Sequence, residues 1–205
     1  AYRELAALPR SARPALLVAA AYGDLTDALD VLAATDIEAV ALDLVHGEVP
    51  PAESLAAWSG RTVLAGVVDG HNIWRADLDA ALDTLERVRD GLGEGRVVVS
   101  TATSLQHTPY SLAREENLGA VKDWLAFAEE KVAEVVTLAA GLAQGREAVA
   151  GELAAARDAR AAREAHPGVH RPQVRDALAA VTPAERDRAD AATRRTAQGA
   201  RLTLP

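Results

Sequence analysis

The stretch VVDGHNIWRADLDAAL, residues 67–82, passes from an apolar run through a group of polar residues into a helical spacing of apolar residues. The apolar run begins at Thr62, and Leu78, Leu82 and Leu85 continue the spacing that follows it. Continuous apolar runs are typical of strands buried on both faces, whereas the later spacing is that of an amphipathic helix. The stretch therefore predicts a strand, a turn that holds the polar residues, and a helix.

Three further apolar runs extend this pattern, at residues 15–20, 37–44 and 96–100, and helical spacing follows the first two at residues 25–32 and 51–58. Strands that alternate with helices indicate parallel βαβ units. We therefore predict an α/β fold in which residues 1–112 form four parallel β/α units, half of a (β/α)8 TIM-type barrel. Half a barrel leaves two sheet edges and an apolar inner face uncovered. The missing half, a second copy or the chain's own extra helices must cover them.

Beyond the fourth strand the pattern is helical. We predict one helix over residues 117–142 with Asn117 as its cap, a second over 147–163, and two more over 171–180 and 183–199. Thr182, Pro183 and Glu185 form a capping box in register for the last of these. Residues 113–200 are thus expected to be a helical extension packing on the barrel, and residues 201–205 an extended linker.

Composition narrows the function classes. A formal charge of -8 opposes a nucleic-acid or anionic-membrane surface, because no basic stripe is available to replace phosphate counterions. No apolar run reaches the roughly 18 to 20 residues of a membrane span, so we expect a cytoplasmic protein. The absence of cysteine excludes disulfides, thiolate metal ligands and a cysteine nucleophile.

Polar residues gather where the predicted strands end, which is where the chemistry of such barrels is placed. The candidate barrel-mouth residues are Asp43, His46, Asp69, His71, Asn72, Ser104 and His107. One hypothesis is a metal site of His46, His71 and His107, supported by Asp43 or Asp69. The alternative is ordinary hydrogen bonding in loops and caps, because no histidine pair sits at i, i+4 on one predicted helix, as a helical metal motif requires.

The polar residues of the opening stretch each have two interpretations. Asp69 is either a general base at a strand end or a turn residue that binds backbone amides, with Gly70 taking a positive φ. Trp74 is expected to be a packing anchor. Arg75 either grips a carboxylate or pairs on the surface with a nearby aspartate, Asp77 or Asp79.

Several blocks carry a resemblance to a known family: DLVHG at 43–47, GVVDGHNIWRADL at 66–78, TSLQHTP at 103–109, LAREE at 112–116 and KDWLAFAEEK at 122–131. In order, spacing and length they resemble the cobalamin-independent methionine synthases, and the likeness covers essentially the whole chain. His71 stands where that family usually has Arg. The resemblance implies that this chain corresponds to the second half of the amino-terminal barrel of a two-barrel protein.

The resemblance implies a function for the longer protein. That family transfers a methyl group from a methyltetrahydrofolate polyglutamate to homocysteine. The homocysteine thiolate is activated by zinc, which is held by His, Cys and Glu ligands of the other, carboxyl-terminal barrel. The expected role of this chain is a scaffold with no catalytic residue and no cofactor of its own, whose partner is the remainder of the synthase chain or a second copy of itself. The alternatives are a stand-alone interaction module that completes its half barrel by oligomerisation, and a small hydrolase-like enzyme using a histidine-bound metal.

Overall fold

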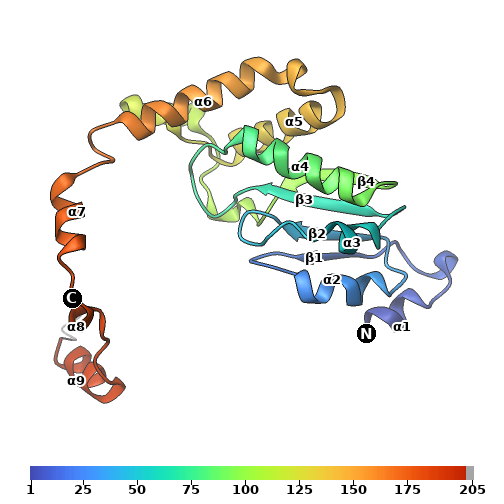
Figure 1. Ribbon diagram of the computed structural model, residues 1–205, viewed down its shortest axis with the longest axis horizontal. Coiled ribbons are helices and arrows are strands. Elements are labelled where there is room, and N and C mark those ends of the chain that lie inside the picture. Colours follow the sequence, from blue (N-terminus) through green and yellow to red (C-terminus); the bar gives the residue numbers. More distant parts are fainter. Residues whose placement is uncertain (202–205) are drawn as a thin grey trace. The chain divides into compact units, whose positions relative to one another are not determined.

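The computed structural model describes residues 1–201, apart from the side chains of Thr26 and Asp27. The chain divides into two compact units, Ala1–Arg163 and Glu164–Pro205. The first unit contains the sheet (Figure 1). The predicted boundaries at residues 112 and 200 stay predictions. Of the predicted linker, Arg201 instead ends a helix, and residues 202–205 lie outside the described residues.

One parallel sheet in the order β1-β2-β3-β4 forms the centre of the first unit. Its strands are β1 (Leu17–Ala20), β2 (Ala39–Asp43), β3 (Thr62–Val68) and β4 (Arg96–Thr101). Leu17 is in register with Ala39, and Thr62 pairs with both Ala39 and Arg96, so the four strands begin at one level. The prediction of four parallel β/α units, an arrangement consistent with half a TIM-type barrel, is confirmed.

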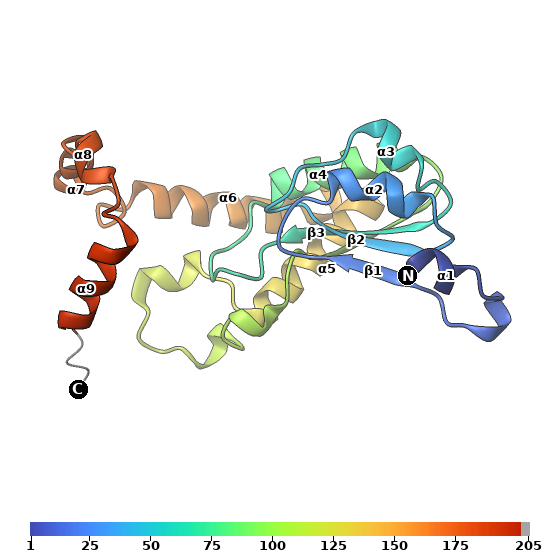
Figure 2. The same ribbon diagram turned by 90° about the horizontal axis from the view of Figure 1, so that it is seen from below.

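Helices connect and flank the strands. The α-helices of the first unit are α1 (Tyr2–Ala6), α2 (Thr26–Ala33), α3 (Ala52–Ala56), α4 (Leu78–Leu92), α5 (Ala128–Gln144) and α6 (Ala150–Ala165), whose last two residues fall in the second unit. Short 3-10 helices are η1 (Arg10–Ala12), η2 (Leu105–His107), η3 (Leu112–Arg114), η4 (Gly119–Trp124) and η5 (Arg146–Val149). Helices α2, α3 and α4 lie on one side of the strands (Figure 2). The second unit contains α7 (Pro172–Ala179), α8 (Pro183–Arg186) and α9 (Ala191–Arg201).

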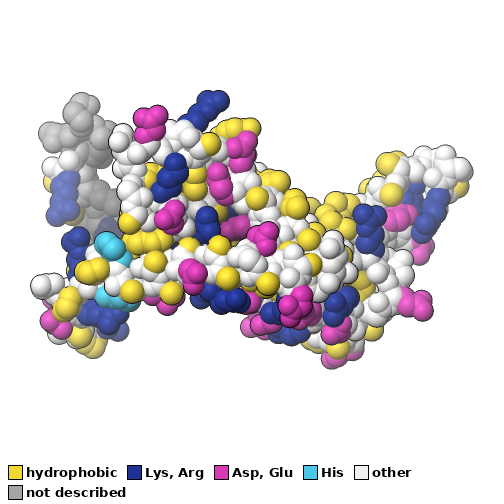
Figure 3. All heavy atoms as spheres, turned by 90° about the horizontal axis from the view of Figure 1, so that it is seen from above, with side chains coloured by type: hydrophobic (Ala, Val, Ile, Leu, Met, Phe, Trp, Pro, Cys, Tyr) yellow, Lys and Arg dark blue, Asp and Glu magenta, His cyan; other side chains and the backbone are white. Residues whose placement is uncertain are grey.

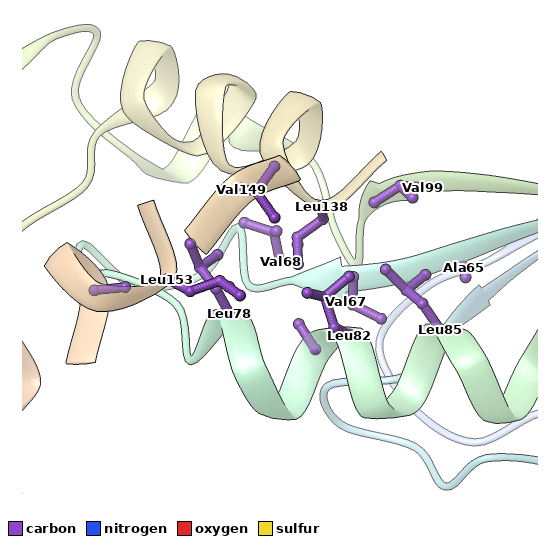
Figure 4. Close-up of a cluster of buried hydrophobic side chains, with 12 residues drawn as sticks. Ala65, Val67, Val68, Leu78, Leu82, Leu85, Val99, Leu138, Val149 and Leu153 are labelled. Atoms are coloured by element: carbon purple, nitrogen blue, oxygen red, sulfur yellow. The ribbon is translucent and has the colours of Figure 1, made fainter. Parts of the chain in front are cut away.

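The buried core lies between the sheet and these helices. Leu82 and Leu85 of α4 face β3, and Leu138 of α5 packs into the same cluster together with Val149 and Leu153 (Figure 4). A second cluster joins α2, α3 and α4 to the first three strands, with Trp58 fully buried in it. The second cluster lies on the face of the sheet that α2, α3 and α4 cover, which corresponds to the outer face of a barrel.

The opposite, inner face of the sheet has little cover. Val18 and Val40 belong to the outer cluster, and successive side chains of a strand point to opposite faces. Leu17 on the inner face is therefore exposed, at 51%. The other inner-face apolar residues are exposed or half-buried: Ala19, Ala41, Leu64 and Val98. Within the described residues β1 pairs only with β2 and β4 only with β3, so both edges of the sheet are also open.

Two of the predicted helices are wrong in their extent. Residues 117–142 do not form one helix, because η4 ends at Trp124 and α5 begins only at Ala128. Leu125 between them is extended and bridges to Trp74, so its backbone groups serve the opening stretch of the sequence instead of a helix. The last predicted helix is likewise broken between α8 and α9, although the Thr182 capping box of α8 is present.

Two surface features bear on function. No helix in residues 1–201 combines the length and the apolar character that a bilayer span requires. Figure 3 shows acidic and basic side chains interspersed over one face of the molecule, with hydrophobic side chains between them.

Candidate functional site at the carboxyl ends of the strands

Asp43 organises the loops that follow the first two strands. Its buried carboxylate accepts hydrogen bonds from the backbone amides of Tyr22 at 3.0 Å, Val45 at 3.1 Å and His46 at 2.9 Å. It also contacts His46 Nδ1 at 3.0 Å. Burial by itself raises the pKa of Asp43, but the hydrogen bonds from His46 and Val45 together outweigh it and leave the pKa below its usual value. The site therefore has an anionic carboxylate behind His46.

The three predicted histidines converge although they follow different strands. The rings of His46 and His71 have centroids 5.5 Å apart, and those of His71 and His107 are 4.9 Å apart in an edge-on arrangement. Tyr22 stacks on the other side of the cluster, with its ring centroid 5.0 Å from that of His71. The Tyr22 hydroxyl lies 3.5 Å from His107 Nε2. His71 thus occupies the centre of a cluster of aromatic rings.

Asp69 fulfils the turn interpretation and also faces the histidines. Its carboxylate accepts from the His71 amide at 2.7 Å and from the Asn72 side chain, and its Oδ2 lies 4.0 Å from His46 Nε2. The expectation of a positive φ at Gly70 is wrong, because Gly70 is absent from the positive-φ glycines of the described chain. A Cβ there would meet the Thr103 carbonyl oxygen at 2.7 Å, so this position needs glycine for space.

The remaining predicted residues have local roles. Asn72 accepts from the Trp74 amide at 3.0 Å, and Ser104 caps η2 by accepting from the Gln106 amide at 3.3 Å. The structure thus brings together His46, Asp69 and His71, with Asp43 behind and His107 beside them. Ser104 and Asn72 shape the loops around this cluster.

Sequence reasoning missed two charged residues beneath the opening stretch, of which Lys131 is buried and Glu134 half-buried. Lys131 is fully buried and donates from Nζ to the Trp74 carbonyl at 3.1 Å, and Glu134 accepts from the Ala76 amide at 3.0 Å. Burial lowers the pKa of Lys131 and raises that of Glu134. Both residues come from α5, three apart, so one helix face holds residues 74–76. Their three-residue spacing predicts a shared helix face but does not distinguish them from the other charged residues of α5.

A cleft of about 440 Å³ lies beside this segment, and its lining includes Asp69, Asn72, Trp74, Lys131, Arg160 and Arg163. Trp74 is 40% exposed, so the expectation that its side chain is a packing anchor is wrong. The Arg163 guanidinium carbon lies over the Trp74 ring, 5.1 Å from the ring centroid. Asp77 pairs with Arg160 and Asp79 with Arg157, both on α6. These pairs replace the predicted surface pairing with Arg75.

Comparisons with known proteins agree with this architecture. A family described as "Cobalamin-independent synthase, N-terminal domain" matches residues 1–93.

This chain is also similar to curated proteins named 5-methyltetrahydropteroyltriglutamate–homocysteine methyltransferase. The one from Mycolicibacterium paratuberculosis is 48% identical over 197 residues, which are 95% of this chain and 26% of the relative. Those from Rhodococcus jostii and Mycobacterium leprae are 47% and 46% identical over the same length. This chain spans about a quarter of these relatives. The resemblance predicted from the sequence is confirmed: the chain is similar to the amino-terminal domain of the cobalamin-independent synthases over residues 1–93 and to the named methyltransferases over 95% of its length.

Proposed function

We propose that this chain forms the second half of the amino-terminal barrel of a cobalamin-independent methionine synthase and acts there as a non-catalytic scaffold. The observation that supports this role is the uncovered inner face of the sheet, on which Leu17 is 51% exposed. An apolar inner face between two open edges matches what a complementary half barrel would cover. The remainder of the synthase chain is the proposed partner, in the cytoplasm, and a second copy of this chain is the alternative cover.

The longer protein is proposed to transfer a methyl group from a 5-methyltetrahydrofolate polyglutamate to homocysteine. This activity is inferred from the similar proteins, which are named as methyltransferases of this kind. The zinc that the family resemblance implies has a thiolate among its ligands, and this chain has no cysteine. The residues present therefore do not fit that zinc, and no step of the transfer is assigned to them. Their proposed work is to fix the strand-end loops, through Asp43 in one loop and Lys131 beneath another.

A chimera tests this proposal. The matching quarter of the Mycolicibacterium paratuberculosis relative is replaced by this chain, and methyl transfer to homocysteine is measured for the chimera and for the isolated chain. We expect an active chimera and an inactive isolated chain. Methyl transfer by the isolated chain would contradict the scaffold role, and so would a folded chimera without activity.

A charged substitution on the inner face sharpens this test. Leu64→Asp in the chimera places a carboxylate where the other half barrel is expected to pack, so it should abolish assembly and activity. Val136→Asp is the matched control, because Val136 is 63% exposed on α5. It should leave both assembly and activity unchanged. Equal effects of the two substitutions would show that the inner face is not covered in the longer protein.

A further inference from the structure

The ring cluster at the carboxyl ends of the strands has the composition of a metal site. We propose that His46, Asp69 and His71 bind one divalent transition-metal ion of the zinc class, with His107 placed to supply a fourth ligand. This proposal goes beyond the scaffold role and does not depend on it. Two imidazoles and a carboxylate suit zinc and its neighbours, which accept nitrogen and oxygen ligands together.

The distances between the candidate ligand atoms support the proposal. One ligand atom from each of His46, Asp69 and His71 lies within 4.8 Å of the others, and His46 Nε2 is 4.0 Å from Asp69 Oδ2. Bonds of about 2.0 Å at tetrahedral angles place zinc ligands about 3.3 Å apart. The cluster must therefore close by about 1.5 Å at most, which side-chain rotation of the exposed His71 towards His46 and Asp69 can supply.

Asp43 prepares His46 for this role. We assign the Nδ1 proton of His46 to the hydrogen bond with Asp43, which leaves the Nε2 lone pair directed at the side of Asp69. A carboxylate behind a ligating imidazole fixes its tautomer and orientation in metal sites. Asp43 is itself held by three backbone amides, so the position of the imidazole is set by the backbone rather than by solvent.

His107 is close enough to join the site after rotation. Its ring meets that of His71 edge-on at 4.9 Å, and its contact with the Tyr22 hydroxyl is long, at 3.5 Å. A hydrogen bond of that length is weak, so it does not oppose rotation strongly. The side chain of His107 is also exposed. The ion would thus have three ligands from two strand-end loops and a fourth from the next loop.

The test is a Zn²⁺ titration of the intact chain, stripped with EDTA, in competition with a chromophoric chelator. We expect one equivalent to bind, and His71→Ala to weaken binding more than tenfold, because it removes a direct ligand. Asp43→Asn, which alters only the group behind His46, is expected to weaken binding by about 10- to 100-fold. His170→Ala is the matched control, because it removes an exposed histidine of the second unit.

Each outcome decides the proposal. Failure of the unaltered chain to bind one equivalent would overturn it, as would equal affinity in His71→Ala and His170→Ala. Far-UV circular dichroism checks that each variant is folded. If Asp43→Asn fails to fold, His71→Ala still decides, because the His71 ring is exposed at the surface. Absorption of bound Co²⁺ gives a second readout, since a tetrahedral site has an intense visible band that His107→Ala should reduce. The binding measurement does not involve methyl transfer, so its failure leaves the scaffold role standing.

Discussion

Replacing Lys131 by Met is expected to destabilise the first unit strongly. The methionine side chain keeps the apolar stem but removes the buried ammonium, which donates to the Trp74 carbonyl and lies near Glu134. Loss of a hydrogen bond from a charged donor costs about 1.5–3 kcal/mol. Removing the ammonium also leaves the half-buried Glu134 without a nearby positive charge, so the loss should lie in the upper part of this range or above it. We expect the free energy of unfolding to fall by that amount.

The double variant Lys131→Met with Glu134→Gln should recover part of this loss. Glutamine still offers an oxygen to the Ala76 amide but carries no charge, so only the lost hydrogen bond remains, at about 1.5–3 kcal/mol. The penalty should also shrink at lower pH. The pKa of Glu134 is raised in the fold, so the fold favours its protonated, uncharged form. The resulting contribution to the free energy of unfolding is fully present below the unfolded pKa of about 4.3 and is lost as pH rises through the folded pKa.

Urea unfolding followed by far-UV circular dichroism, at pH 7 and pH 5, measures these differences for the single and double variants. The Lys131→Met variant should lose less stability at pH 5 than at pH 7. A free energy of unfolding within about 0.5 kcal/mol of the unaltered chain, the range of ordinary surface changes, would contradict a structural role of the Lys131 ammonium. A double variant as unstable as the single one would contradict the effect assigned to the uncompensated Glu134 charge.

Three further predictions follow from the sheet and its edge. Gly66→Ala should lower the free energy of unfolding by about 1–3 kcal/mol in urea titrations, because the new Cβ would lie 2.6 Å from the Ala102 Cα; an unchanged midpoint would contradict this. Leu85→Ala should lower it by about 2–5 kcal/mol, because Leu85 is fully buried against the sheet, and a loss under 1 kcal/mol would count against the assigned core. The hydrogen bond from Arg13 holds the pKa of Glu38 at about 2, so this carboxylate stabilises the fold above about pH 4.3 and ceases to do so as pH falls through about 2. A carboxyl NMR titration should show that pKa and its rise in Arg13→Ala; equal values in the two chains would exclude the assigned cause.

The sequence predicted the sheet well because each strand is a continuous apolar run that ends at a polar turn. The helix over residues 78–92 was equally clear, since its apolar residues share one face and Asp77 caps it. The region of residues 117–142 was mispredicted for a physical reason. Leu125 and its neighbours are apolar at helical spacing, but they are buried against Ile73 and Trp74 through backbone contacts that no local pattern reveals.

The sequence predicted which residues form the candidate site better than it predicted how their side chains are arranged. Parallel strands bring their carboxyl ends to one edge, so the three histidines could be expected near one another. The stacking of Tyr22 on His71 depends on a positive φ of 71° at Tyr22, which sequence spacing does not indicate. Lys131 and Glu134 lie on a helix with several charged residues, and only the fold distinguishes the buried Lys131 and the half-buried Glu134 from the solvated ones.

We propose that the sheet is half a barrel whose inner face requires a cover. The most direct test is the solution mass of the purified chain by light scattering, measured against the mass of one chain, 21.5 kDa. Leu17 and the apolar residues beside it should drive association, so we predict a dimer or larger species, and Leu64→Asp should shift it towards the monomer. A stable monomer of the unaltered chain at tens of micromolar would contradict the claim.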